Sequence, residues 1–329
     1  MCKNPLLLRE LNLSERELGD TRVIQIAALL QDKHCKLSTL ILCRCSITEK
    51  QCIILTSALK LNPSLLRELE LSENELKNIG VNHLCDVLKD SHCKLERLRF
   101  LKSPAAQEAC DYLTKVLGKS PLFLTELDLS EDKIGDLDWE KLSALLVDSH
   151  SKLEKIKLNN CELTEKSCSV LATVLSSKTI LKEMNLNNSH LQDSGVKEIC
   201  EGLKNTVCEL EILKLSDCSI TEEGYKALAS ALRSNPSHLI ELDLTGNDPG
   251  QSGVKELSDL LQDPNFQLKT LRFLGPAADE ACQYVTGIVG KNPLLLRELN
   301  LSDCELGDTQ VNQITALLQD KHCKLSTLM

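Results

Sequence analysis

Apolar residues recur along this chain in a pattern with a constant period. The motif L-x-x-L-x-L appears as LRELNL, LSTLIL, LRELEL, LERLRF, LTELDL, LEKIKL, LKEMNL, LEILKL, LIELDL, LKTLRF and LRELNL, and begins again as LSTLM. Its first leucine falls at residues 8, 37, 66, 95, 124, 153, 181, 210, 239, 268, 296 and 325, so the spacing is 28 or 29 residues throughout. Self-similarity at a fixed period of this length is typical of solenoid proteins.

Each repeat has two halves with different periods. Alternating leucines, as at Leu69 and Leu71, predict a short strand with one apolar face. The stretch that follows, such as VNHLCDVLKD at residues 81–90, has apolar side chains at helical spacing. Parallel strands lie about 4.8 Å apart whereas packed helices need about 8–10 Å, so stacked repeats must curve with the strands inside. We predict an α/β, right-handed horseshoe solenoid with parallel strands on the concave face and helices on the convex face.

The repeats run from one end of the chain to the other. We expect residues 1–329 to form a single solenoid of about eleven full repeats. Residues 3–40 and 291–328 match at 33 of 38 positions, and both termini fall inside a repeat without an obvious polar cap. Solenoids normally need such caps, so we expect a segment of a longer array or self-association through the ends.

Extending the motif through the turn after each strand reveals a resemblance to a known family. The extended motif L-x-x-L-x-L-x-x-[N/C]-x-[L/I] resembles the ribonuclease-inhibitor class of leucine-rich repeats. As in that class, two repeat types alternate, represented by LSENELKNIG at residues 71–80 and LCRCSITEKQ at residues 42–51. Residues 231–264 are similar, more narrowly, to the C-terminal repeats of NLR (NACHT-LRR) innate-immune receptors, especially the large fish group. The resemblance implies a ligand-sensing, protein-binding or autoinhibitory array of a cytosolic receptor.

Two departures from the pattern qualify this resemblance. Repeats four and ten lose the turn signature and read LRFLKSPAAQEAC at residues 98–110 and LRFLGPAADEAC at residues 271–282. The nucleotide-binding module of such receptors is also missing from the chain. GKS at residues 118–120 imitates the end of a phosphate-binding loop, but Leu113 stands where that loop needs glycine. We interpret GKS as a helix end.

The cysteines occupy recurring slots of the repeat. Cys45, Cys161, Cys218 and Cys304 share the turn slot that Asn74 and Asn247 fill elsewhere, and the rest recur in the helix or before a strand. Cysteines in one slot never occupy successive repeats, which places them too far apart for disulfides. Neither these cysteines nor the recurring histidines converge on a metal site. Cys43 differs because its slot otherwise holds serine, and we predict an exposed thiol there.

Residues that flank the inward leucines should line the concave face, because side chains alternate along a strand. The charged residues among them form the candidate protein-binding surface: Glu10, Glu68, Glu70, Arg97, Arg99, Glu126, Asp128, Lys155, Lys157, Lys214, Glu241, Asp243, Arg272 and Glu298. Their sign alternates from strand to strand. They can therefore match the charges of a partner, or pair with one another, for example as Glu70, Arg99, Asp128 and Lys157.

Composition narrows the classes of function. The net charge is -10 and aromatic residues make up 2% of the chain, so nucleic-acid binding is not expected. No apolar stretch is long enough for a membrane span, and the chain start lacks the features of a secretory signal, which favours a cytoplasmic protein. No catalytic constellation or cofactor motif stands outside the repeat slots, so we do not expect an enzyme.

The alternative function is a ribonuclease-inhibitor-like binder of a basic, secreted-type ribonuclease. The negative net charge favours such a partner by electrostatic steering. However, tight interfaces rely on Trp, Tyr and Arg anchors, and the inner strand positions have no Trp or Tyr. The single tryptophan, Trp139, occupies a helix slot that holds valine elsewhere, so we expect it to pack in the core.

Overall fold

A computed structural model describes residues 7–88, 90–99, 125–130, 139–261, 263, 265–272, 298–300, 308–319 and 326–328. The chain divides into two compact units, Met1–Lys157 (unit 1) and Leu158–Met329 (unit 2). The turns of repeats four and ten and the GKS segment lie outside the described residues.

Parallel strands that pair in chain order form the inner layer of each unit. Unit 1 contains β1 (Glu10–Asn12), β2 (Thr39–Ile41), β3 (Glu68–Glu70), β4 (Arg97–Arg99), β5 (Glu126–Asp128) and β6 (Lys155–Lys157). Unit 2 contains β7 (Glu183–Asn185), β8 (Ile212–Lys214), β9 (Glu241–Asp243), β10 (Thr270–Arg272), β11 (Glu298–Asn300) and β12 (Thr327–Leu328). Each strand starts two residues after the first leucine of its motif.

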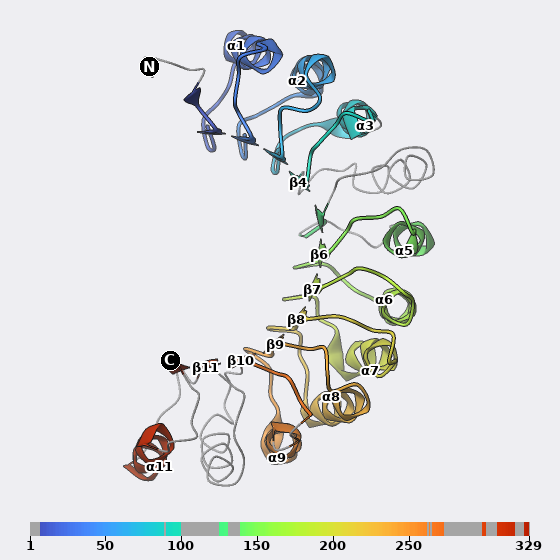
Figure 1. The fold of residues 1–329 in the computed structure, drawn as a ribbon, viewed down its shortest axis with the longest axis vertical. Helices are drawn as coiled ribbons and strands as arrows, with labels where there is room; N and C mark the ends of the chain where they lie inside the picture. The colour runs from blue at the N-terminus through green and yellow to red at the C-terminus, as the bar shows by residue number, and fades with distance from the viewer. Residues whose placement is uncertain are drawn as a thin grey trace. The chain divides into compact units, whose positions relative to one another are not determined.

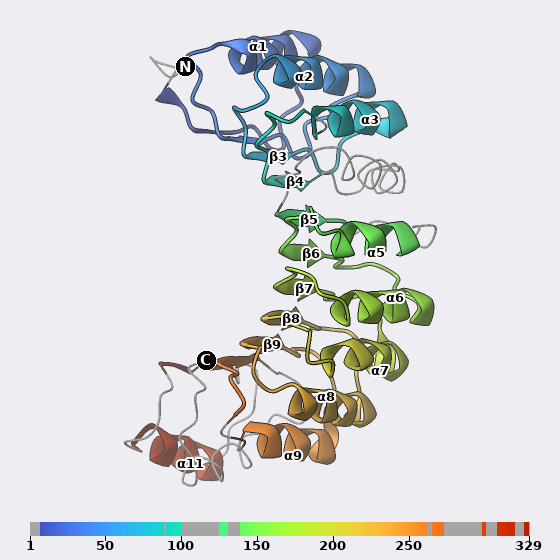
Figure 2. The same cartoon turned by 45° about the vertical axis from the view of Figure 1, so that its right-hand side comes forward.

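Helices form the outer layer. Unit 1 has α1 (Asp20–Gln31), α2 (Glu49–Leu61), α3 (Lys77–Leu88) and α5 (Trp139–Val147). Unit 2 has α6 (Glu165–Leu175), α7 (Gln192–Leu203), α8 (Glu222–Ser234), α9 (Gly250–Leu261) and α11 (Asp308–Gln319). Helices α1 to α3 in unit 1 and α6 to α9 in unit 2 lie side by side behind the strands (Figure 1 and Figure 2).

The core lies between these two layers and consists mostly of leucine. The middle residue of each strand points to the helices, so Leu40 and Leu69 are only 1% and 2% exposed while their neighbours on the strands are half-buried. Helix residues at three- and four-residue spacing meet them, such as Leu55 and Leu59 of α2. Trp139 is also buried, as expected for a packing residue.

The turn slot after the strand is a second structural layer. Asn74 is buried; its Nδ2 donates to the Leu42 carbonyl at 2.7 Å, and its Oδ1 accepts the N–H groups of Cys45 and Ile47 at 3.0 and 2.9 Å. Asn247 makes the same arrangement in unit 2. Each asparagine thus satisfies buried backbone groups of its own repeat and the preceding one, as expected from the sequence.

The strands, helices and turn slots together confirm the predicted fold class, an α/β leucine-rich-repeat solenoid. The single array of about eleven repeats stays a prediction.

Candidate functional site

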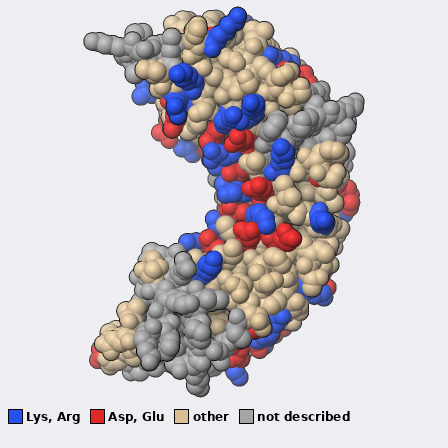
Figure 3. All heavy atoms as spheres, in the orientation of Figure 1, with Lys and Arg blue, Asp and Glu red and all other residues tan. Residues whose placement is uncertain are grey.

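The inner strand face of unit 1 has two rows of charged side chains in register. In the first row, Glu68, Arg97, Glu126 and Lys155 lie opposite one another on β3 to β6. In the second row, Glu70, Arg99, Asp128 and Lys157 do the same. Acidic and basic side chains are therefore interleaved over this face, as Figure 3 shows.

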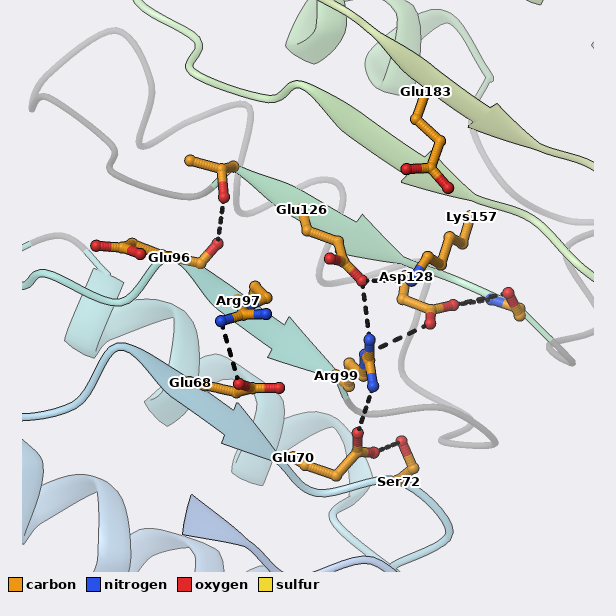
Figure 4. Close-up of polar contacts among 12 residues, drawn as sticks. Glu68, Glu70, Ser72, Glu96, Arg97, Arg99, Glu126, Asp128, Lys157 and Glu183 are labelled. Atoms are coloured by element: carbon orange, nitrogen blue, oxygen red, sulfur yellow. Dashed lines mark hydrogen bonds and ion pairs between the residues drawn. The ribbon is translucent and has the colours of Figure 1, made fainter. Parts of the chain in front are cut away.

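Arg99 is the centre of the ion-pair network (Figure 4). Its guanidinium nitrogens lie 3.4 Å from Glu70 on β3, 3.0 Å from Glu126 on β5 and 3.7 Å from Asp128 on β5. Burial by itself disfavours the charged guanidinium, but the hydrogen bond and attraction of Glu126, followed by Glu70 and Asp128, raise the pKa of Arg99 above its ordinary value. One side chain thus connects three neighbouring strands.

Glu126 receives two cations. Lys157 Nζ lies 2.7 Å from Glu126 Oε1, and a guanidinium nitrogen of Arg99 lies 3.0 Å from the same oxygen. Burial of Glu126 favours its neutral form, but the hydrogen bonds from Lys157 and Arg99 outweigh this effect and lower the pKa of the carboxyl.

Arg97 with Glu68, and Arg99 with Glu70 and Asp128, pair directly across adjacent strands as the sequence suggested. Lys157 is the exception, because its pairing is diagonal. Lys157 reaches Glu126 in the first row and not Asp128, its register partner in the second row. The four-carbon stem of lysine is long enough to span the diagonal between adjacent strands. Asp128 instead accepts the Ser130 hydroxyl at 2.7 Å.

The same diagonal recurs in unit 2. Lys214 on β8 lies 3.3 Å from Glu183 on β7, and Arg272 on β10 lies 2.6 Å from Glu241 on β9. Arg272 is also 4.0 Å from Asp243. Glu183 is a paired carboxylate that the predicted binding surface did not include, although its slot holds glutamate in every second repeat.

The remaining predicted residues differ in their surroundings. Arg97 is half exposed and lies 3.4 Å from Glu68. Lys155 is exposed on β6. Glu10 is exposed on β1 and has no ion-pair or hydrogen-bond partner for its side chain among the described residues. Glu298 is described only through its position on β11.

A further charged group at the turn edge was missed by sequence reasoning. Arg44 Nε lies 2.7 Å from Glu73, and its NH1 lies 3.5 Å from Glu15. All three residues have positive φ values, between 53° and 63°. The sequence signal that could have revealed this group is that Glu15, Arg44 and Glu73 occupy the same position of three successive repeats, 29 residues apart, with alternating charge.

The ten cysteines whose side chains the structure describes are free thiols, and all of them except Cys43 are buried. Cys43 is half-buried; its burial, followed by the charges of Glu70 and Glu73, raises the pKa of the thiol. Burial raises the pKa of Cys52 to about 12. These thiols are therefore poorly ionised and suited to packing more than to nucleophilic chemistry.

No cluster of three or more His, Cys, Asp or Glu side chains in the described residues has an arrangement that could hold a metal ion. Among the described helices, none combines the length and apolar character that crossing a membrane requires.

Sequence comparisons place these features among known proteins. A family model described as "Leucine Rich repeat" matches residues 208–229 and 294–309. Ribonuclease inhibitor from Sus scrofa is 36% identical over 98% of this chain and 70% of its own length. Ribonuclease inhibitor from Mus musculus is 34% identical over 100% of this chain and 72% of its own length. Human NACHT, LRR and PYD domains-containing protein 12 is 34% identical over 100% of this chain, which corresponds to 30% of that protein.

A structural comparison agrees with the fold. The solved structure titled "Crystal structure of Rad7 and Elc1 complex in yeast" matches with a TM-score of 0.51 and 16% identity, over 91% of this chain and 64% of that one. This similarity concerns the fold alone. The sequence relatives are closer, and the ribonuclease inhibitors are matched over more than two thirds of their length. The chain belongs to the ribonuclease-inhibitor-type family of leucine-rich-repeat proteins, which also includes the repeat regions of NACHT, LRR and PYD domains-containing proteins.

Proposed function

We propose that this chain is the protein-binding repeat array of an NLR-like, cytosolic innate-immune receptor, where it senses a ligand or restrains the receptor. The supporting observation is that the charges on the inner strands neutralise one another through Arg99, Lys157, Lys214 and Arg272. A face neutralised in this way selects partners by shape and by a few local groups, not by a broad field of one sign.

A ribonuclease-inhibitor-like function is the second candidate. The observation in its favour is the match to ribonuclease inhibitors over 70% and 72% of their length, together with the net charge of -10. Capture of a basic enzyme needs carboxylates that are free to receive its cations. On β3 to β5 those carboxylates already have internal partners, which ranks this candidate second.

Titration calorimetry with a pancreatic-type ribonuclease separates the two candidates. We expect no heat of binding at physiological salt, and at most a weak complex at low salt that is lost when the salt is raised. A tight one-to-one complex that survives physiological salt would reverse the ranking. Sequencing the complete transcript for an upstream nucleotide-binding module tests the receptor assignment independently.

The proposal also includes a cytoplasmic compartment and self-association of the chain through its ends. Free thiols at the ten cysteines whose side chains the structure describes are consistent with a reducing, cytoplasmic compartment. Self-association through the chain ends gives a mass by light scattering that rises with concentration. A constant monomeric mass up to high concentration contradicts self-association without affecting the binding function.

A further inference from the structure

The strands alternate between an acidic class and a class that supplies cations. Every odd-numbered strand begins with glutamate, at positions 10, 68, 126, 183, 241 and 298. Even-numbered strands β4, β6, β8 and β10 place lysine or arginine at their third position, at residues 99, 157, 214 and 272. Each of these cations reaches a carboxylate on a neighbouring strand.

The first-position glutamates of β3, β5, β7 and β9 all have a cation partner from an adjacent strand. Those pairs are Glu68 with Arg97, Glu126 with Arg99 and Lys157, Glu183 with Lys214, and Glu241 with Arg272. Glu10 of β1 is the exception among the described side chains, since it is exposed and no described cation reaches it.

Strand β2 explains why no cation among the described residues reaches Glu10. β2 is aligned with β1 in the same register that the other strand pairs use, with Asn12 opposite Ile41. Its third position is Ile41, where β4, β6, β8 and β10 have a cation. The position two residues after Ile41 is also less polar, because it holds Cys43. In other repeats a serine at this position donates to a carboxylate, as Ser130 does to Asp128 and Ser72 to Glu70. Ile41 and Cys43 are both half-buried and so partly open to solvent.

We infer that the inner face of β1 and β2 binds a lysine or arginine side chain of a partner protein, which supplies from outside the cation that β2 lacks. The charged head pairs with Glu10, and the aliphatic stem packs on Ile41, as long cationic side chains do on apolar surface. The charges on β3 to β6 already have partners, so a newcomer there must first displace an internal pair. This inference rests on the proposed protein-binding function and specifies where its partner binds.

The first test supplies the missing cation within the chain. Ile41→Lys should pair with Glu10 and raise the midpoint of thermal unfolding by roughly 1–2 °C, and the gain should disappear in the double variant with Glu10→Gln. Ile24→Lys is the matched control, because Ile24 is 55% exposed on α1 and its substitution adds the same charge away from the strands. An Ile41→Lys effect that is independent of Glu10 would overturn the geometry on which the inference rests.

The second test uses a phage-displayed library of linear dodecapeptides selected on the immobilised full chain. Selected peptides should contain lysine or arginine, and both Glu10→Gln and Ile41→Lys should weaken their binding by about ten-fold or more, while Ile24→Lys leaves it unchanged. Peptides that bind all four proteins equally would overturn this docking site but leave the proposed protein-binding function standing. Failure to recover any binding peptide would overturn the inference and would also count against the proposed function.

Discussion

Arg99 shows how a single residue can connect three strands without being deeply buried. Its side chain is 31% exposed, whereas the carboxylates of Glu126 and Asp128 that it contacts are each 9% exposed. Exposed ion pairs contribute about 0–1 kcal/mol, but removal of one partner from a buried pair costs about 3–5 kcal/mol because the other charge is left uncompensated. Arg99 lies between these limits, since it is half-covered and its partners are nearly buried.

Substitution of Arg99 by methionine should lower the free energy of unfolding by about 1–3 kcal/mol. The change keeps the apolar stem and removes the charge, so Glu70, Glu126 and Asp128 lose their shared counter-ion. Urea unfolding followed by circular dichroism measures the loss. Arg97→Met is the control, because Arg97 is 47% exposed with one ion-pair contact at 3.4 Å, and we expect it to cost less than about 1 kcal/mol. Equal effects of the two substitutions would contradict the central role of Arg99.

Cys43 should be labelled by iodoacetamide faster than the nine cysteines whose side chains the structure shows to be buried. Its labelling should still be slow at neutral pH, because its raised pKa leaves little thiolate. The rate should increase with pH well beyond neutrality. Glu73→Gln should accelerate labelling, since Glu73 raises the pKa of Cys43 while neighbouring Arg44 lowers it. Peptide mapping by mass spectrometry, with Cys43→Ser as the reference, assigns the signal. Unchanged labelling in Glu73→Gln would contradict this account.

At the scale of the elements, helix N-termini are completed either within a repeat or from the repeat before. In α2, Thr48 and Gln51 form a reciprocal capping box. In α8 the position equivalent to Gln51 is Gly224, which has no side chain to form a box. The carboxylate of Asp193 in α7 takes over, accepting the N–H groups of Thr221 and Gly224 at 2.8 and 3.1 Å. A Cβ at Gly224 would lie 2.6 Å from Asp193 Oδ1, so glycine makes room for this contact.

Asp193→Ala should therefore destabilise unit 2 by about 1–2 kcal/mol, because it leaves α8 without an N-terminal cap. Glu201→Ala, at an exposed position of α7, is the control and should change stability by less than about 0.5 kcal/mol. Hydrogen exchange at the first turn of α8 provides a local measurement. Protection that does not change in Asp193→Ala would show that the carboxylate is not the cap.

The sequence predicted those features that depend on the repeat alone. Strand positions, the buried asparagine slot and the packing role of Trp139 followed from periodicity, because each residue's slot fixes its side of the strand or helix. The diagonal reach of Lys157 did not follow, since it depends on side-chain length and on the separation of neighbouring strands. The cap from Asp193 was also not visible, because it joins residues 28 positions apart in an otherwise ordinary helix start.

At the scale of the whole molecule, the paired carboxylate of Glu126 makes stability depend on pH. The lowered pKa of Glu126 means that its ionised form is favoured by folding. Its contribution is complete above the ordinary carboxyl pKa of 4.5 and is lost as the pH falls through the lower, folded value. Acid therefore weakens the strand face by protonating Glu126, which then loses its ion pairs with Arg99 and Lys157.

Urea unfolding at a series of pH values should reveal this dependence. Glu126→Gln should be less stable than the native chain at neutral pH, by about 1–2 kcal/mol, and the difference should shrink as the pH falls below the ordinary carboxyl pKa. Glu140→Gln, at an exposed position of α5, is the control and should follow the native curve. A difference that stays constant down to strongly acidic pH would exclude the ion pairs of Glu126 as its source.

The alternation of acidic and cationic strands also restricts how such an array can gain or lose repeats during evolution. Loss or duplication of one repeat would bring two strands of the same class together, either two acidic or two cationic strands, and leave like charges facing each other. Loss or duplication of two adjacent repeats would keep every diagonal pair. Residues 3–40 and 291–328, which are nearly identical, lie ten repeats apart, and ten is an even number. The unit of duplication or deletion in the evolution of this array is therefore a pair of repeats. Homologues of different length should differ from it by an even number of repeats.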